Sequence, residues 1–77
     1  MVQKVNYKKY WFEEEDLLKP IDWDYFNLLS ERIKDALELY MRGGISIGKS
    51  AEIAGLSYVE FDRIRGKSRI PIRILID

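Results

Sequence analysis

Apolar residues recur at steps of three and four along the segment from Trp23 to Tyr40. The stripe consists of Trp23, Phe26, Leu29, Ile33, Leu37 and Tyr40. Charged residues fill half of the positions between them, so the spacing predicts one amphipathic helix that buries a single face. Asp22 can cap its start by accepting a backbone hydrogen bond. Gly43 can end it, because glycine readily adopts the left-handed conformation that follows many helices.

A shorter helix is predicted next, from about Ile47 to Ala54. Ser46 stands at the position of its N-cap. Gly55 follows at the place where a left-handed residue commonly closes a helix. The spacing of these residues therefore predicts a helix of about two turns between two loops.

Two signals mark the start of the following helix. Ser57 and Glu60 have the spacing of a capping box, in which each side chain bonds the backbone N–H of the other residue. Leu56 and Phe61 flank them at the positions of a hydrophobic staple. We therefore expect a helix that begins at Ser57, runs to about residue 65 and is ended by the glycine at position 66.

The C-terminal segment predicts a strand. Residues 69–76 are mostly apolar and β-branched. Pro71 lacks a backbone donor, which confines the start of the strand to a sheet edge. The expected fold class is mainly α: a small helix-turn-helix domain over residues 22–77 with a short C-terminal strand, preceded by an N-terminal arm over residues 1–21.

A chain of 77 residues is enough for one small domain. Such a domain buries only about 60% of the surface that its unfolded chain exposes, so a twin subunit would stabilise it. We expect a homodimer that forms through either the Trp23–Tyr40 stripe or the C-terminal strand. Whether that strand pairs within one subunit or between two stays open.

The chain contains neither cysteine nor histidine. It therefore lacks the commonest general base, the commonest metal ligand and the best nucleophile. We expect no enzyme, no catalytic residues, no metal and no cofactor. The N-terminus has no apolar signal-peptide core, and no apolar run approaches the roughly 20 residues that span a bilayer. We therefore expect a cytoplasmic protein without membrane contact.

The stretch Gly43–Ser50 matches the phosphate-loop pattern G-x-x-x-x-G-K-[ST]. A phosphate loop must follow a buried strand and open a helix within a parallel sheet. Here a predicted helix precedes Gly43, and the 27 residues after Ser50 are too few for the rest of such a sheet. We interpret the match as a coincidence and expect no nucleotide.

Charge is unevenly distributed although the net charge is zero. Residues 1–41 carry six Lys/Arg and nine Asp/Glu, whereas residues 42–77 carry seven and four. Five basic residues and no acid lie between Arg63 and Arg73. The C-terminal half therefore favours an anionic partner, with a solvated basic face as the competing interpretation.

The spacing of Ala51, Gly55, Phe61 and Ile64 is typical of a helix-turn-helix. A small residue lets the two helices cross closely, glycine makes the turn, and the apolar residues join the helices. In DNA-binding versions the second helix enters the major groove with its N-terminal residues. The candidate DNA-binding residues are Lys49, Ser57, Tyr58, Val59, Asp62, Arg63, Arg65, Lys67 and Arg69.

Different roles are expected for these side chains. Val59 can meet a thymine methyl group, and Arg63 can read guanine. Residues 57–58 can bond phosphates or base edges, while Lys49 and residues 67–69 can hold phosphates. Asp62 suits a DNA-reading helix only if it accepts a hydrogen bond from a cytosine amine.

The run Arg42–Ser57 (RGGISIGKSAEIAGLS), followed by Glu60, Phe61 and Arg69–Ile72, resembles uncharacterised protein family 0175. Its members are small prokaryotic proteins regarded as helix-turn-helix antitoxins, and they often occur beside toxins with a PIN nuclease domain. The resemblance covers about residues 33–74. It implies a DNA-binding transcriptional regulator that represses its own operon and neutralises a PIN-domain-type toxin.

Under this interpretation the N-terminal or the C-terminal arm contacts the toxin. The acidic cluster Glu13–Asp16 can occupy a basic nuclease cleft or compete with its magnesium-binding acids. The alternative interpretation is a protein-interaction module that uses the helical hairpin without DNA contact.

Overall fold

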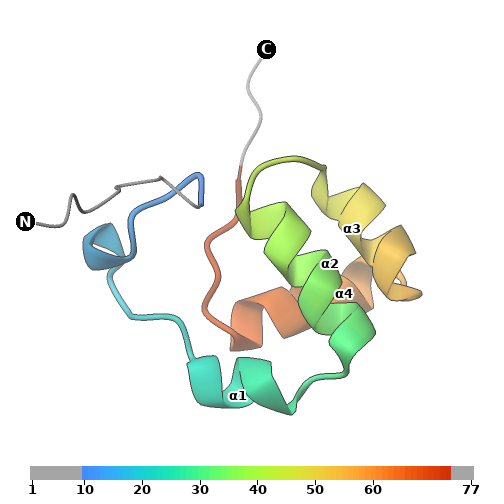
Figure 1. The fold of residues 1–77 in the computed structure, drawn as a ribbon, viewed down its shortest axis with the longest axis horizontal. Coiled ribbons are helices and arrows are strands. Elements are labelled where there is room, and N and C mark those ends of the chain that lie inside the picture. Colours follow the sequence, from blue (N-terminus) through green and yellow to red (C-terminus); the bar gives the residue numbers. More distant parts are fainter. Residues whose placement is uncertain (1–9, 74–77) are drawn as a thin grey trace, which may run out of the picture.

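The computed structural model describes residues 10–73. Within them the chain is mainly helical, as predicted (Figure 1). The elements are η1 (Glu14–Asp16), α1 (Trp23–Leu28), α2 (Glu31–Met41), α3 (Ile47–Ala54) and α4 (Tyr58–Lys67). Helix α2 packs against α3, and α3 packs against α4. None of the described helices is long and apolar enough to cross a membrane.

A single core joins the helices to the segments that flank them. Its buried apolar side chains are Ile21, Phe26, Ala36, Leu37, Tyr40, Met41, Ala51, Ala54, Phe61 and Ile70. Small Ala51 and Ala54 are α3's fully buried apolar side chains, which lets this helix lie close to its neighbours. Phe26, Leu37 and Tyr40 of the Trp23–Tyr40 stripe are buried in the chain's own core. Those three side chains are therefore not available as a dimer surface.

The prediction of one continuous helix from Trp23 to Tyr40 is wrong. The chain leaves the helical conformation at Leu29, whose ψ is 159°, and α2 begins after Ser30. The Ser30 hydroxyl accepts a hydrogen bond from the backbone N–H of Ile33 at 3.3 Å and so caps a new helix. Serine competes with the helical backbone in this way, and the bend still lets both helices bury their apolar faces.

Two of the predicted helix starts have the expected caps. The side chain of Asp22 accepts a hydrogen bond from the backbone N–H of Tyr25 at 3.0 Å, and that of Ser46 accepts one from Lys49 at 3.1 Å. Asp22 also donates its own N–H to the Ser68 carbonyl at 2.9 Å. This bond ties the start of α1 to the residue that follows α4.

The predicted left-handed glycines are confirmed at the ends of α2 and α3. Gly43 has φ 85° and Gly55 has φ 75°. After α3, Gly55 donates to the Glu52 carbonyl and Leu56 donates to the Ala51 carbonyl, both at 3.0 Å. This paired bonding satisfies carbonyls that the helix end leaves without a partner.

The predicted end of α4 at Gly66 is wrong. The helix continues through Gly66 to Lys67, and the left-handed residue is Arg69, with φ 65°. Arg69 donates to the Gly66 carbonyl at 3.0 Å, and Ile70 donates to the Arg65 carbonyl at 3.2 Å. The same paired bonding therefore closes α4, although a residue with a Cβ is strained in this conformation by about 1–2 kcal/mol.

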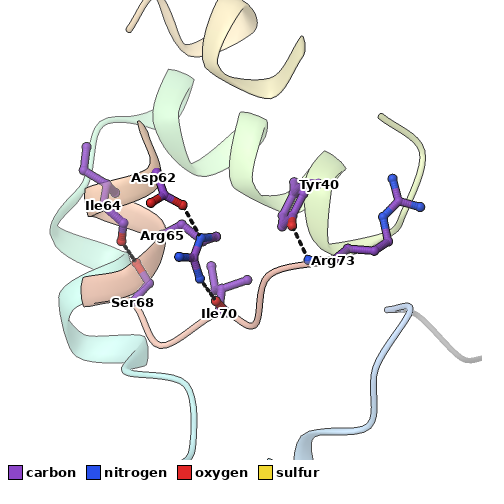
Figure 2. Close-up of polar contacts among 7 residues, drawn as sticks. All are labelled: Tyr40, Asp62, Ile64, Arg65, Ser68, Ile70 and Arg73. Carbon is purple, nitrogen blue, oxygen red and sulfur yellow. Dashed lines mark hydrogen bonds and ion pairs between the residues drawn. The ribbon is translucent and has the colours of Figure 1, made fainter. Parts of the chain in front are cut away.

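No strand forms in the described part of the predicted segment 69–76, and the remainder lies outside the described residues. Side-chain bonds hold the tail instead. The backbone N–H of Arg73 donates to the Tyr40 hydroxyl (Figure 2). Its guanidinium donates to the carbonyls of Gly43 at 3.2 Å and Ile45 at 3.1 Å. The tail is thereby fixed across the loop between α2 and α3.

The described part of the N-terminal arm packs on the same end of α2. Trp11 donates its backbone N–H to the Met41 carbonyl at 3.0 Å and its indole N–H to the Tyr40 carbonyl at 3.1 Å. Further along the arm, Ile21 is buried in the core. Both ends of this segment are therefore part of the packed structure, whereas residues 13–16 and 18–20 are exposed.

Opposite substitutions at two left-handed positions test this account of the helix ends. Gly55→Ala should lower the free energy of unfolding by about 1–2 kcal/mol, because it places a Cβ at positive φ. Arg69→Gly should raise it by about 0.5–1 kcal/mol, since the relieved strain exceeds the extra chain entropy of glycine. Urea unfolding of both variants measures the two changes. A lower stability for Arg69→Gly would contradict the assignment of strain to Arg69.

Candidate nucleic-acid interface

Helices α3 and α4 are joined by a short turn. Gly55 is left-handed, the chain is extended at Ser57, and α4 starts at Tyr58. Phe61 is fully buried and Ile64 is partly buried against the same core. One face of α4 is thus fixed inward, which leaves the opposite face directed to solvent.

The capping box predicted at the start of α4 is present. The Ser57 hydroxyl accepts the backbone N–H of Glu60 at 3.2 Å, and the Glu60 carboxylate accepts the backbone N–H of Ser57 at 3.0 Å. These bonds hold the pKa of Glu60 below its ordinary value, and the nearby charge of Arg63 lowers that pKa further. One oxygen of the carboxylate is therefore occupied by the helix start, while Glu60 itself is exposed and stays ionised.

Asp62 and Arg65 form an ion pair on the side of α4 that faces the tail (Figure 2). Arg65 donates from Nε to the Asp62 carboxylate at 2.9 Å and from Nη1 to the Ile70 carbonyl at 2.6 Å. Its side chain is 16% exposed. Arg65, a predicted DNA contact, therefore braces the end of α4 against the tail, and Asp62 is bound to this arginine.

Val59, Arg63 and Lys67 form the outer stripe of α4. All three residues are exposed, and their four-residue spacing places them on one face of the helix. Tyr58, beside the stripe in the first turn, is 51% exposed, and Val59 is 63% exposed. The structure thus places three of the predicted DNA-binding residues, Val59, Arg63 and Lys67, on one solvent-facing side of α4, with Tyr58 exposed about 100° away around the helix axis.

The other candidates lie around this stripe. Arg69 is exposed just after α4, and Ser57 is exposed at its start. Lys49 comes from the first turn of α3, where its ammonium lies 3.4 Å from the Glu52 carboxylate in an exposed ion pair. Exposed pairs of this kind contribute little to stability, so Lys49 can exchange this partner for another anion.

Arg32 supports the turn, and it was not among the predicted site residues. It reaches from α2 and donates from Nε to the Ile53 carbonyl at 2.7 Å, near the end of α3. Its guanidinium lies 3.0 Å from the point where a Cβ on Gly55 would stand. No local pattern signals this contact, because the two bonded residues are 21 positions apart.

The segment Gly43–Ser50 does not have the architecture of a phosphate loop. Helix α2 precedes it where such a loop requires a strand. The hydroxyl of Ser50, which would face a metal ion, is buried and donates to the Ser46 carbonyl at 2.9 Å. Among the described residues no group of three or more Asp or Glu side chains is arranged to hold a metal ion.

Comparison of the chain with protein-family models, with curated proteins and with solved structures finds no match in any of the three. The resemblance to the antitoxin family therefore stays a prediction that rests on the motif residues from Arg42 to Ile72.

The capping box gives a pH-dependent prediction. Because folding lowers the pKa of Glu60, its carboxylate stabilises the fold fully above the ordinary value of 4.5 and loses this effect as the pH falls through the folded-state pKa. Glu60→Gln removes this titration and should flatten the decline in stability below that value. Thermal unfolding followed by circular dichroism from about pH 6 to about pH 3 measures the difference. Identical pH profiles would show that ionisation of Glu60 does not contribute to stability.

Proposed function

We propose that this protein is a DNA-binding regulator of the antitoxin type, which represses its own operon and neutralises a PIN-domain-type toxin. The observation that carries the DNA-binding part is the outer stripe of α4, in which Val59, Arg63 and Lys67 face solvent together. A helix that follows a tight turn and offers such side chains is the usual reading element for a DNA major groove.

The charges around this stripe support DNA as its partner. The two acids of α4, Glu60 and Asp62, are engaged by Ser57 and Arg65 within the chain. Glu60 keeps its negative charge at the start of α4, and Arg63, Arg65 and Lys67 outnumber the two acids of the helix by one. Cationic side chains on an exposed helix suit the phosphate-lined groove of a duplex.

A homodimer is part of this proposal. Two copies would place their α4 helices in successive major grooves about 34–36 Å apart, so the operator would carry two inverted half-sites. Outside α4, the helices expose two large apolar side chains, Leu28 on α1 and Leu39 on α2. These two leucines are the candidates for contact with a second subunit.

The second candidate function is a protein-interaction module. Its specific support is the exposed pair Tyr58 and Val59, because aromatic and aliphatic side chains on a surface often mark protein contacts. The zero net charge also gives only weak non-specific attraction to DNA.

Arginine substitution separates the two functions. Arg63→Ala should weaken binding to the duplex upstream of the protein's own gene by roughly 5- to 100-fold, the value of one good base contact. Arg42→Ala is the matched control, since Arg42 is an exposed arginine at the C-terminal end of α2 that pairs with Glu38. Fluorescence anisotropy at several salt concentrations measures both variants, and affinity should fall steeply with salt.

Two results would contradict the proposal. One is equal weakening by Arg63→Ala and Arg42→Ala, which would indicate non-specific attraction. The other is no binding of that duplex even at low salt, which would favour the protein-interaction module.

The acidic arm gives a separate test of the toxin-neutralising role. Glu15 and Asp16 are exposed in η1, and replacing both with lysine should reduce co-purification of a co-expressed PIN-type toxin. Asp35 and Glu52 are exposed acids of α2 and α3, so the same double replacement there is the control. Affinity capture after co-expression measures the retained toxin. Full retention by the arm variant would remove the arm from the proposed toxin contact.

A further inference from the structure

We infer that α4 reads a thymine and a guanine about two base-pair steps apart, through Val59 and Arg63 respectively. This inference rests on the proposed DNA-binding function and adds the composition and spacing of the half-site. It follows from the order of the side chains on the outer stripe and from the bonds that Glu60 and Asp62 make with Ser57 and Arg65 within the chain.

Val59 is the apolar member of the stripe. It lies in the first turn of α4 and is 63% exposed, whereas Phe61, two residues on, is fully buried. The thymine methyl is the apolar group that the base edges of a major groove present. An exposed valine at the leading turn of the helix therefore has one well-matched counterpart in DNA.

The helix geometry sets the distance between the two contacts. Arg63 follows Val59 by four residues, which is about 6 Å along the helix axis. Successive nucleotides are about 3.4 Å apart along a strand, so this distance corresponds to about two base-pair steps. Lys67 lies another turn away, where the helix leaves the bases and phosphates come within reach of a long side chain.

Both acids of α4 have partners within the chain. A carboxylate can accept a hydrogen bond from a cytosine amine. Glu60 instead bonds the Ser57 backbone, and Asp62 bonds Arg65. Recognition therefore depends on a methyl group and on the acceptor edge of guanine, with no carboxylate contact to cytosine.

The charge of the stripe favours DNA over an apolar protein groove as the occupant. The two positions that follow Val59 on this face, Arg63 and Lys67, are cationic and exposed. Burying them against an apolar partner would leave two charges without solvent or counter-ion. In a major groove the same two side chains meet guanine and phosphate.

Single-atom changes in DNA test the inference. Duplexes are selected from a random-sequence library on the full-length protein, and the best binder is resynthesised with uracil for each thymine and 7-deazaguanine for each guanine in turn. One uracil, which lacks only the methyl, should weaken binding about three- to fivefold. A guanine without N7, about two steps away, should weaken binding at least as much.

Two variants test which side chain makes each base contact. Val59→Ala should lose the uracil effect and keep the guanine effect, and Arg63→Ala should do the reverse. Val59 is exposed on a helix, so its replacement by alanine should leave the circular dichroism spectrum unchanged.

The outcomes separate this inference from the proposed function. Selected duplexes that tolerate uracil at every position, or a Val59→Ala variant that keeps the uracil effect, would overturn the inference and leave DNA binding in place. A library from which the protein retains no duplex would overturn both and favour a protein as the partner of this face.

Discussion

Hydrogen bonding at the ends of short helices is the constraint on which the rest of this structure depends. Helices α1 to α4 contain 6, 11, 8 and 10 residues. Each helix leaves four N–H and four C=O groups without partners inside it, so a large share of this small domain consists of helix ends. Serine or aspartate begins each helix, and a left-handed residue follows three of them. The turn that aims α4 outward is one of these ends.

Helix ends with strong local signals could be predicted from the sequence, and those with weak or distant ones could not. Gly43 and Gly55 were assigned correctly, since glycine is the residue that most easily adopts positive φ. Ser30 was missed because it lies inside an apolar stripe and lacks the glutamate of a capping box. The predicted helix-ending residue is Gly66, but Arg69 ends α4. The bonds from Arg69 and Ile70 of the following tail to the last turn decide where the helix ends. The contact of Arg32 with α3 depends on tertiary packing, which no window of sequence contains.

The structure also changes the meaning of the basic C-terminal segment. A count of charges treats its five arginines and lysines as equivalent. Arg65 and Arg73 turn inward and bond backbone carbonyls, so they hold the fold together. Arg63 and Lys67 remain on the outer stripe, next to a valine that a charge count ignores. The candidate site is therefore smaller and less basic than the sequence indicated, and it combines an apolar contact with charged ones.

Tyr40 accepts a hydrogen bond at its backbone carbonyl and another at its side-chain hydroxyl, and together these two bonds have a mechanical consequence. Its hydroxyl accepts the backbone N–H of Arg73 (Figure 2). Its carbonyl accepts the indole N–H of Trp11. The two terminal segments are therefore anchored to opposite ends of one residue in the last turn of α2. A force that pulls on either segment is transmitted to this one residue, so the first and last described parts of the chain share a common point of attachment.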